Sequence, residues 1–332
     1  MRVLGIDTSC DETSVAVVEQ RRILANRVYG QNALHQPFGG VVPEVAARAH
    51  VERLLPALHE ALEEAGGADA VAVTTRPGLI GPLLVGLSAA KAFALAKGLP
   101  LVGVHHLEAH VAAAYLLDPA PEPPFVALIA SGGHTVLYHL PEAGRYLCLG
   151  QTADDAAGEC FDKVATILGL PYPGGPSLER AAQGGRRDAY RFPRPLRDDP
   201  GDGFSFSGIK TAVLYLVKGQ DGRRRDADVA RPPLADLAAS AQEAIVDVLA
   251  HKAVRAAARS GSGKLVVGGG VAANGRLREL LLERCAAAGV QAFIPPRALC
   301  TDNAAMIAMR GSELLEAGVR DGFDLDADPY AE

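Results

Sequence analysis

Cysteines are few in this 332-residue chain, and their spacing matches no cysteine metal cluster. The five cysteines are odd in number and scattered, and no Cys-x-x-Cys pair occurs; they are Cys10, Cys148, Cys160, Cys285 and Cys300. This pattern excludes a zinc ribbon or an iron–sulfur cluster built on cysteine alone. It favours a reducing compartment, so we expect a cytoplasmic protein.

Signals for membrane insertion or secretion are also lacking. No run of uncharged apolar residues reaches the length of a membrane-spanning helix. The first residues, Met1 to Asp7, have neither the apolar region nor the cleavage site of a signal peptide, and they predict a strand instead. We therefore expect no contact with a membrane.

Positive charge is in slight deficit, with a formal net charge of −6. This balance argues against wrapping nucleic acid over the whole surface but permits a local basic patch. Arginines gather at Arg186, Arg187 and Arg191 and continue to Arg197, with Tyr190 and Phe192 between them, and again at 223–225. Either segment predicts a binding surface for RNA phosphates, or else an ordinary solvated loop.

Neither a Walker A motif nor G-x-G-x-x-G is present, yet one glycine loop has a nucleotide-binding context. Lys264 to Val267 predicts a strand, and the loop Gly268, Gly269 and Gly270 leads from it towards Asn274 and a helix. A loop between a strand and a helix N-terminus offers free N–H groups to an anion. These three glycines are our candidates for nucleotide binding.

Two strand–turn–strand segments, 3–19 and 125–140, resemble each other and predict an internal duplication. The proline-rich stretch 119–124 is the clearest linker between them. We expect an N-terminal lobe over 1–118 and a C-terminal lobe over 119–332, with the last helix free to pack back on the first lobe. The turn of the first hairpin holds the carboxylates Asp11 and Glu12, which are candidates for an accessory catalytic role.

Two histidines define the clearest candidate site. His106 and His110 follow an apolar strand and fall at i and i+4 of a predicted helix, so both imidazoles lie on one face. Two imidazoles suit zinc or iron, with a carboxylate completing the set. Asp302 is the candidate carboxylate, although Thr301 or Asp302 is also expected to cap the last long helix. Ordinary hydrogen-bonded histidines are the alternative.

A zinc protease is the first rival interpretation, and the order of residues argues against it. The glutamate of H-E-x-x-H directly follows the first histidine, whereas Glu108 lies two residues from each histidine here. At about 100° per residue its side chain points about 200° away from both imidazoles. Glu108 is therefore badly placed to be the general base for a metal-bound water.

Taken together, these stretches resemble the TsaD family, the tRNA threonylcarbamoyladenosine transferases once misnamed O-sialoglycoprotein endopeptidases. The resemblance runs in order along essentially the whole chain. The matching stretches are GIDTSCDETSVAV (5–17), GGVVPEVAARAH (39–50), HLEAH (106–110), SGGHT (131–135), DDAAGECFDKVA (154–165), YPGGP (172–176), FSFSGIK (204–210), GGGVAAN (268–274) and TDNAAMIA (301–308).

The resemblance implies an α/β fold of the two-lobed actin/Hsp70/sugar-kinase type, with duplicated ribonuclease H-like domains. It implies one metal ion, Fe²⁺ or Zn²⁺, on His106, His110 and Asp302. It also implies a set of substrate contacts, namely Ile129, Ala130, Ser131, Gly132, Gly133, Asp162, Gly175, Asn274 and Glu179, the last being a position where the family often has aspartate. The family usually has Gly-Pro-Gly where this chain has Arg76-Pro77-Gly78.

The implied activity is a transfer and not a hydrolysis. Threonylcarbamoyl-AMP, made by a separate enzyme, would give its threonylcarbamoyl group to N6 of the tRNA adenosine next to the anticodon, and AMP would leave. Relatives in bacteria work with tRNA, a paralogous partner subunit (TsaB) and a small ATPase (TsaE), and Mg²⁺ with an adenine nucleotide is a further expectation. A sugar or acetate kinase of the same fold, and a non-catalytic scaffold like TsaB, are the remaining alternatives.

Overall fold

The computed structural model describes residues 1–219 and 232–330, and the described chain forms two compact units. Unit 1 comprises Met1–Pro121 and Pro295–Glu332, and unit 2 comprises Glu122–Ile294. The division falls between Pro121 and Glu122, inside the proline-rich stretch 119–124, whereas the expected boundary is at 118. The expected C-terminal lobe of 119–332 differs from unit 2, because residues from Pro295 onward pack with the first unit.

Unit 1 is built on a five-stranded sheet in the order β3-β2-β1-β4-β5. β1 pairs antiparallel with β2 and parallel with β4. Its elements are β1 (Arg2–Asp7), β2 (Glu12–Glu19), β3 (Arg22–Gly30), α1 (Asn32–His35), η1 (Gln36–Phe38), α2 (Pro43–Ala65), β4 (Ala70–Arg76), α3 (Ile80–Lys97), β5 (Leu101–His105), α4 (His106–Ala112), η2 (Ala113–Leu116), α10 (Arg297–Cys300) and α11 (Ala304–Glu316).

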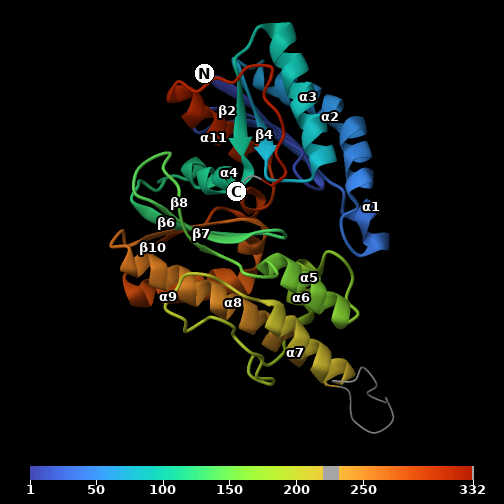
Figure 1. Ribbon diagram of the computed structural model, residues 1–332, viewed down its shortest axis with the longest axis vertical. Helices are drawn as coiled ribbons and strands as arrows, with labels where there is room; N and C mark the ends of the chain where they lie inside the picture. The colour runs from blue at the N-terminus through green and yellow to red at the C-terminus, as the bar shows by residue number, and fades with distance from the viewer. Residues whose placement is uncertain (220–231, 331–332) are drawn as a thin grey trace. The chain divides into compact units, whose positions relative to one another are not determined.

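Unit 2 repeats this plan in the order β8-β7-β6-β9-β10. β6 pairs antiparallel with β7 and parallel with β9, as β1 does with β2 and β4, which confirms the duplication (Figure 1). Its elements are β6 (Phe125–Ala130), β7 (Thr135–Leu140), β8 (Leu147–Gln151), α5 (Ala157–Ile167), α6 (Gly174–Ala181), α7 (Ser207–Lys218), α8 (Leu234–Arg259), β9 (Lys264–Gly268), η3 (Gly270–Ala273), α9 (Gly275–Ala288) and β10 (Gln291–Phe293).

The central strands of unit 1 are buried on both faces because helices cover each side. Alternate residues point to opposite faces of a strand. Leu4 and Ile6 of β1 pack in a core with residues of α2 and α3, whereas Gly5, between them, faces α11. Figure 1 shows α2 and α3 on one side of this sheet and α11 on the other.

Among the described residues, α3 alone is long and apolar enough to cross a membrane, judged by length and composition. Lys91 interrupts its apolar run. Leu83, Leu87, Ala90 and Ala94 of this helix are buried within unit 1. These residues form the side of the helix that packs within unit 1, while Ile80, Leu84 and Leu95 are exposed.

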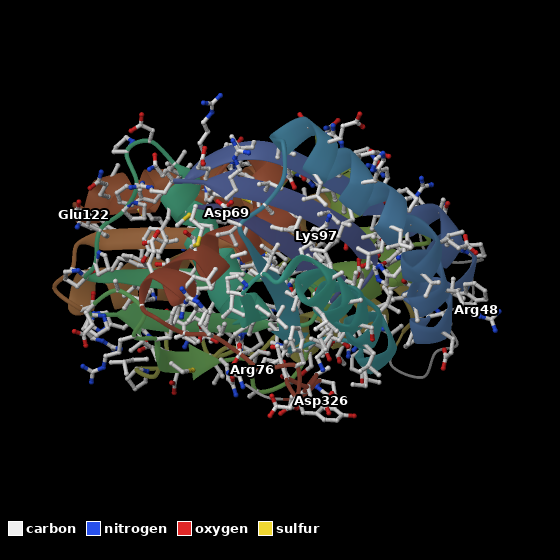
Figure 2. All side chains as sticks on the ribbon, turned by 90° about the horizontal axis from the view of Figure 1, so that it is seen from above. Arg48, Asp69, Arg76, Lys97, Glu122 and Asp326 are labelled. Carbon is white, nitrogen blue, oxygen red and sulfur yellow. The ribbon has the colours of Figure 1, made fainter. Side chains whose placement is uncertain are left out.

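The C-terminal segment after α11 returns along the sheet of unit 1. The N–H of Gly103 in β5 donates to the Asp321 carboxylate at 2.7 Å, and the Asp328 N–H donates to the carbonyl of Thr75 at 2.9 Å. Figure 2 labels Arg76 and Asp326 in this region. The segment thus covers part of the exposed edge of β5, which would otherwise present unpaired N–H groups.

Close packing of α11 on the sheet depends on small residues. A Cβ at Gly5 would collide with the carbonyl oxygen of Ala304 and lie 2.7 Å from the backbone nitrogen of Ala308. A Cβ at Gly311 would collide with Ala72 in β4. Because both obstacles at Gly5 are backbone or helix atoms, they cannot move aside cheaply.

We expect Gly5→Ala to destabilise the protein by about 1–3 kcal/mol, the typical range for overpacking a core. Gly40→Ala is the matched control, since no atom lies within 4 Å of its Cβ position and its φ is not positive. Urea unfolding monitored by circular dichroism measures both. Equal stability of the two variants would contradict the close approach of α11 to β1.

Candidate functional site

Two imidazoles and one carboxylate converge in unit 1, as the sequence predicts. His106 is the first residue of α4, His110 lies one turn later, and Asp302 comes just before the N-cap of α11. His110 Nε2 lies 3.1 Å from Asp302 Oδ1, and His106 Nε2 lies 3.5 Å from the same oxygen. One ligand atom from each residue lies within 4.8 Å of the others, a spacing that suits one ion.

The residues that cap α4 and α11 explain why the three side chains converge. They also correct the expectation that Thr301 or Asp302 caps the last long helix. β5 ends at His105, whose Nδ1 accepts the N–H of Leu107 at 3.2 Å and caps α4. α11 is capped by Asn303, which accepts the N–H of Met306 at 3.2 Å. The prediction that Thr301 or Asp302 caps this helix is therefore wrong. Because Asn303 provides the cap, the Asp302 carboxylate can face the imidazoles.

The residues present fit a transition metal. His110 is fully buried, and neither of its ring nitrogens has a hydrogen-bond partner, because the approach of Nε2 to Asp302 does not have hydrogen-bond geometry. A buried polar atom without a hydrogen-bond partner costs free energy of folding. A metal ion bound to Nε2 would provide a partner for one of the two His110 ring nitrogens. Two imidazoles and a carboxylate are a common donor set for zinc and for non-haem iron.

Asp7 is a further residue of this centre that the sequence analysis did not single out. Its Oδ2 lies 3.5 Å from His106 Nδ1, and its Oδ1 accepts a hydrogen bond from Thr74 Oγ1 at 2.9 Å. Ser9 Oγ lies within hydrogen-bond distance of the same Nδ1, at 3.3 Å, so Ser9 and the Asp7 carboxylate together direct Nε2 of this ring towards a metal. The available signal for Asp7 was its position, a carboxylate at the carboxyl end of the buried strand β1.

Charges within the centre set its pKa values. Burial lowers the pKa of His106, but Asp302 and Asp7 outweigh burial and hold that pKa well above its usual value. Burial lowers the pKa of His110, and the nearby Asp302 carboxylate opposes this without reversing it. Burial would raise the pKa of Asp302, yet the two imidazoles hold it far below its usual range. The carboxylate therefore stays ionised and able to bind a cation.

Asp11 and Glu12 lie in the same unit, Asp11 in the turn between β1 and β2 and Glu12 as the first residue of β2. Asp11 is buried, and its carbonyl accepts the N–H of Gln31 at 3.0 Å. Burial, and then the charges of Asp302 and Asp11, raise the pKa of Glu12 well above its usual value. The structure thus places both carboxylates near the metal ligands, while their catalytic role stays a prediction.

Glu108 has a different partner, as its position in the helix predicts. Arg310 of α11 donates from Nε to Glu108 Oε2 at 3.0 Å. The glutamate is thus held by an arginine, and it is not among the residues that gather around the candidate ion. This arrangement gives no support to a zinc protease.

The predicted substrate-binding residues of unit 2 lie on segments linked by a closed ring of contacts. A Cβ on Gly158 of α5 would lie 2.5 Å from the carbonyl oxygen of Ser131, and Asp162 accepts the N–H of Gly174 at 2.8 Å. Glu179 of α6 accepts the N–H of Gly275 at 2.9 Å. These contacts join the end of β6 to α5, α6 and the start of α9.

The glycine loop closes the ring. Gly269 has φ +87°, and a Cβ there would collide with the carbonyl of Ala130, so only glycine fits. Asn274 caps α9 by accepting the N–H of Leu277, and its Nδ2 donates to Gln242 Oε1 at 2.8 Å. Four glycines of these segments have nothing within 4 Å of their Cβ positions; they are Gly132, Gly133, Gly175 and Gly270.

Within this ring the predicted residues have two different environments. Ile129 and Ala130 are fully buried in β6 and have only backbone atoms to offer at the strand end. Gly268 ends β9 beside Ile129, with which it is paired. The open glycines provide backbone N–H groups without side chains, the arrangement that suits close approach to a phosphate.

The arginine-rich segment is tied to α8 by ion pairs. Arg194 and Arg197 bind Asp247 instead of projecting freely, at 2.5 and 3.0 Å. Arg186 lies 3.3 Å from Asp236, and Arg187 lies 3.6 Å from Glu279, while both remain well exposed. The positions 223–225 lie outside the described residues.

Phe192 corrects part of the expectation for this segment. Its side chain is 6% exposed, so it cannot stack on an unpaired base without rearrangement. Tyr190 is partly buried beside it, with ring centroids 6.3 Å apart. Arg191 is exposed. The arginines Arg186, Arg187 and Arg191 are thus the part of the patch that stays accessible.

Comparisons with known proteins give the family to which the chain is similar. A family model described as tRNA N6-adenosine threonylcarbamoyltransferase, TsaD, matches residues 22–309. A protein of that name from Anaeromyxobacter dehalogenans (strain 2CP-C) is 54% identical, over 99% of this chain and 98% of its own. Another, from Bordetella petrii, is 52% identical over 96% of this chain and 92% of its own.

Among solved structures, HypF of T. kodakarensis matches with a TM-score of 0.62 and 15% identity. The match covers 95% of this chain and 48% of HypF. At that identity the likeness concerns the fold alone. It agrees with the expected α/β fold of the actin/Hsp70/sugar-kinase type, in which a five-stranded sheet occurs twice.

We expect His110→Ala to lose the metal and to keep its fold, because the side chain is a candidate ligand and its ring nitrogens make no hydrogen bond that the fold would lose. Metal content by mass spectrometry after dialysis, with circular dichroism for the fold, measures both effects. His59→Ala is the matched control, since that side chain is 81% exposed. A full complement of metal in His110→Ala would refute the ligand assignment.

We expect Gly269→Val to weaken binding of AMP by tenfold or more while metal content stays normal, because the added side chain displaces the loop from Ala130. Gly144→Val is the control, with a similar φ of +77° and open space around it. Isothermal titration with AMP gives the affinities. Equal affinity of the two variants would remove this loop from the nucleotide site.

Proposed function

Because the chain belongs to the TsaD family of tRNA N6-adenosine threonylcarbamoyltransferases, we propose how its two units divide the work of this transfer. The reaction moves the threonylcarbamoyl group of threonylcarbamoyl-AMP to N6 of the adenosine on the 3′ side of the anticodon, in tRNAs that read codons beginning with A. The observation that carries the proposal is the convergence of His106, His110 and Asp302 in a chain with relatives this similar.

The glycine segments of unit 2 bind the AMP portion. N–H groups at Gly132, Gly133 and Gly270 have no Cβ beside them and can approach the phosphate. As N6 attacks the carbamoyl carbon, the bond from that carbon to the phosphate oxygen breaks, and negative charge grows on the departing phosphate. Fixed N–H donors stabilise that charge without having to reorganise. Ser131, Asp162 and Asn274 keep these segments in place through their hydrogen bonds.

The ligand set of unit 1 holds a transition metal, iron or zinc. Such an ion, when bound, supplies Lewis-acid polarisation and orientation of a carbonyl oxygen. Asp7 fixes the His106 ring so that Nε2 points to the ion position, and Asp302 supplies the negative charge that the ion requires. Mg²⁺ accompanying an adenine nucleotide and a cytoplasmic location complete this part of the proposal.

Asp11 and Glu12 are the accessory carboxylates of this proposal. Asp11 ends the turn that follows Asp7, and Glu12 begins β2. Two observations support an accessory role for these carboxylates, namely their position in the chain and the influence of Asp302 on the pKa of Glu12. A carboxylate there could help to remove the proton that the attacking amine loses.

The rival functions fit the ligand set less well. A kinase of this fold needs an acidic base with Mg²⁺, and two buried imidazoles give it no advantage. A non-catalytic scaffold needs no metal ligands at all, whereas this chain keeps His106, His110 and Asp302 together. The transferase is the function that uses all three.

Partners are a further part of the proposal. We expect the paralogous subunit TsaB and the small ATPase TsaE to work with this chain. An exposed apolar face on α2 and α3, which pack side by side in unit 1, supports a protein partner; it carries Val51, Leu55, Ile80 and Leu84, which are 43–65% exposed. Exposed apolar side chains gathered on neighbouring helices often mark an interaction surface.

The transfer itself is tested with the purified chain, threonylcarbamoyl-AMP and unmodified tRNA. We expect mass spectrometry of the digested tRNA to show the threonylcarbamoyl nucleoside, with TsaB and TsaE raising the yield over repeated turnovers. The same mixture containing His110→Ala is the control, and we expect its product to fall by more than the roughly 10–100-fold that is typical of changing an outer partner of a metal ligand. No product from the wild-type chain with both partners present would overturn the proposal.

The tRNA surface is tested at Arg186, Arg187 and Arg191, which we propose contact phosphates. Each lost phosphate contact lowers the slope of log affinity against log salt by about 0.7–0.9, so the triple alanine variant should lose roughly 2 units of slope. Arg22, Arg48 and Arg145 form a control triple of the same charge, and all three are exposed. A slope no different from the control would place the tRNA elsewhere, for example at 223–225.

A further inference from the structure

The metal ligands stand on two helices that are joined by a nearly buried ion pair. Arg310 of α11 donates from Nε to Glu108 Oε2 at 3.0 Å, and its second terminal nitrogen lies 2.8 Å from the same oxygen. The first terminal nitrogen lies 3.4 Å from Glu313 of the same helix. The arginine side chain is only 6% exposed. An arginine with two carboxylate partners in such a place is held in one orientation.

The ion pair and the candidate ligands involve the same two helices, α4 and α11, but the Glu108 side chain lies on a different side of α4 from the two imidazoles. Glu108 lies between His106 and His110 in sequence, about 200° around the helix from each. Arg310 lies on α11, about 12 Å along the helix from Asp302 at 1.5 Å per residue. The pair thus joins the back of the histidine helix to the helix that starts beside the carboxylate ligand.

α4 needs such a support because it is short. It has seven residues, and it continues as the 3-10 turn η2. A helix of two turns has little intrinsic stability, so tertiary contacts must hold it. A metal site requires its ligand atoms within about 0.2 Å of their ideal distances. A small sliding of α4 along α11 would therefore spoil the site without unfolding the protein.

We propose that Glu108 and Arg310 are positioning residues that fix α4 against α11 and so set the distance from both imidazoles to Asp302. The proposal rests on the metal centre proposed above and extends it to two side chains that do not touch the metal. It also gives Glu108 a role other than that of a general base. Outer residues of this kind typically change metal affinity by about 10–100-fold.

A purely electrostatic effect of these two residues on the metal predicts other changes in metal affinity than a positioning role does. Two substitutions distinguish the electrostatic effect from the positioning role. Glu108→Gln removes a negative charge, so a purely electrostatic effect would weaken binding of a cation. Arg310→Met removes a positive charge and would strengthen it. If the pair positions α4, both changes weaken binding, because Glu108→Gln replaces the ion pair by a weaker hydrogen bond and Arg310→Met removes the donors altogether.

The experiment uses the full chain, stripped of metal and reloaded with Co²⁺ as a spectroscopic probe and with Zn²⁺ for affinity. Competition with a chelator gives the dissociation constant, and we expect it to rise about 10–100-fold in Glu108→Gln and in Arg310→Met. We also expect the visible spectrum of the Co²⁺ form to change in both, since ligand distances and angles change. A loss of stability alone would leave that spectrum as it is in the wild type.

Glu243→Gln is the matched control. Glu243 and Arg276 form a comparably buried pair, at 2.7 Å, between α8 and α9 of unit 2. The substitution removes the same charge from the same kind of ion pair, in a unit whose described residues include none of the candidate ligands. We expect a lower melting temperature, with unchanged Zn²⁺ affinity and an unchanged Co²⁺ spectrum.

The outcomes distinguish the possible failures. Opposite changes in affinity for Glu108→Gln and Arg310→Met, with constant spectra, would show a field effect and overturn the positioning role. Wild-type affinity and spectrum in Glu108→Gln would overturn it as well, even if Arg310→Met does not fold. Normal metal loading in His110→Ala would instead refute the metal centre itself, whatever the two positioning variants do.

Discussion

The close approach of α11 to the sheet of unit 1 is the constraint on which the metal centre depends. Gly5 and Gly311 have no side chains where the helix and the strands meet, so the helix can lie directly on β1 and β4. Ser14 of β2 accepts the first N–H of the helix, from Ala304, and fixes where it begins. Asp302 lies just before that start, and so a segment from the far end of the chain delivers a carboxylate to two histidines near its middle.

The duplicated sheet shows how one architecture can carry two kinds of chemistry. Both sheets have the same strand order and the same parallel and antiparallel pairs. In unit 1 the strand ends carry polar side chains of the candidate metal centre, namely Asp7 at the end of β1 and His106 directly after β5. In unit 2 the corresponding end of β6 carries glycines, and the backbone supplies the polar groups. Function thus resides in the connections, while the strands supply a common frame.

Much of the site could be predicted from sequence because its signals are local. The i and i+4 spacing of His106 and His110 needs only one helical turn, and Glu108 is excluded from the metal face by the same periodicity. The two hairpins revealed the duplication because β-hairpins are contiguous in sequence. The glycine loop was recognisable because a strand and a helix flank it directly.

The features that sequence could not supply are those fixed by contacts between distant segments. Asp7 faces His106 only because β1 lies near β5 in the sheet, with β4 between them. The cap at Asn303, one residue beyond the predicted one, depends on the backbone conformation at which α11 meets β2. Phe192 is part of an arginine-rich segment that looks exposed in sequence, yet ion pairs to Asp247 hold that segment against α8 and bury the ring.

The same distinction explains why Glu108 misleads a motif search. Its neighbourhood in sequence is that of a metal-dependent hydrolase, with a glutamate between two histidines. Its neighbourhood in space is an arginine from another helix, which takes up the carboxylate that a hydrolase would need as a base. With that carboxylate committed, no glutamate of the histidine helix is left to activate water. A site built in this way favours transfer to an amine nucleophile that does not depend on a metal-bound hydroxide.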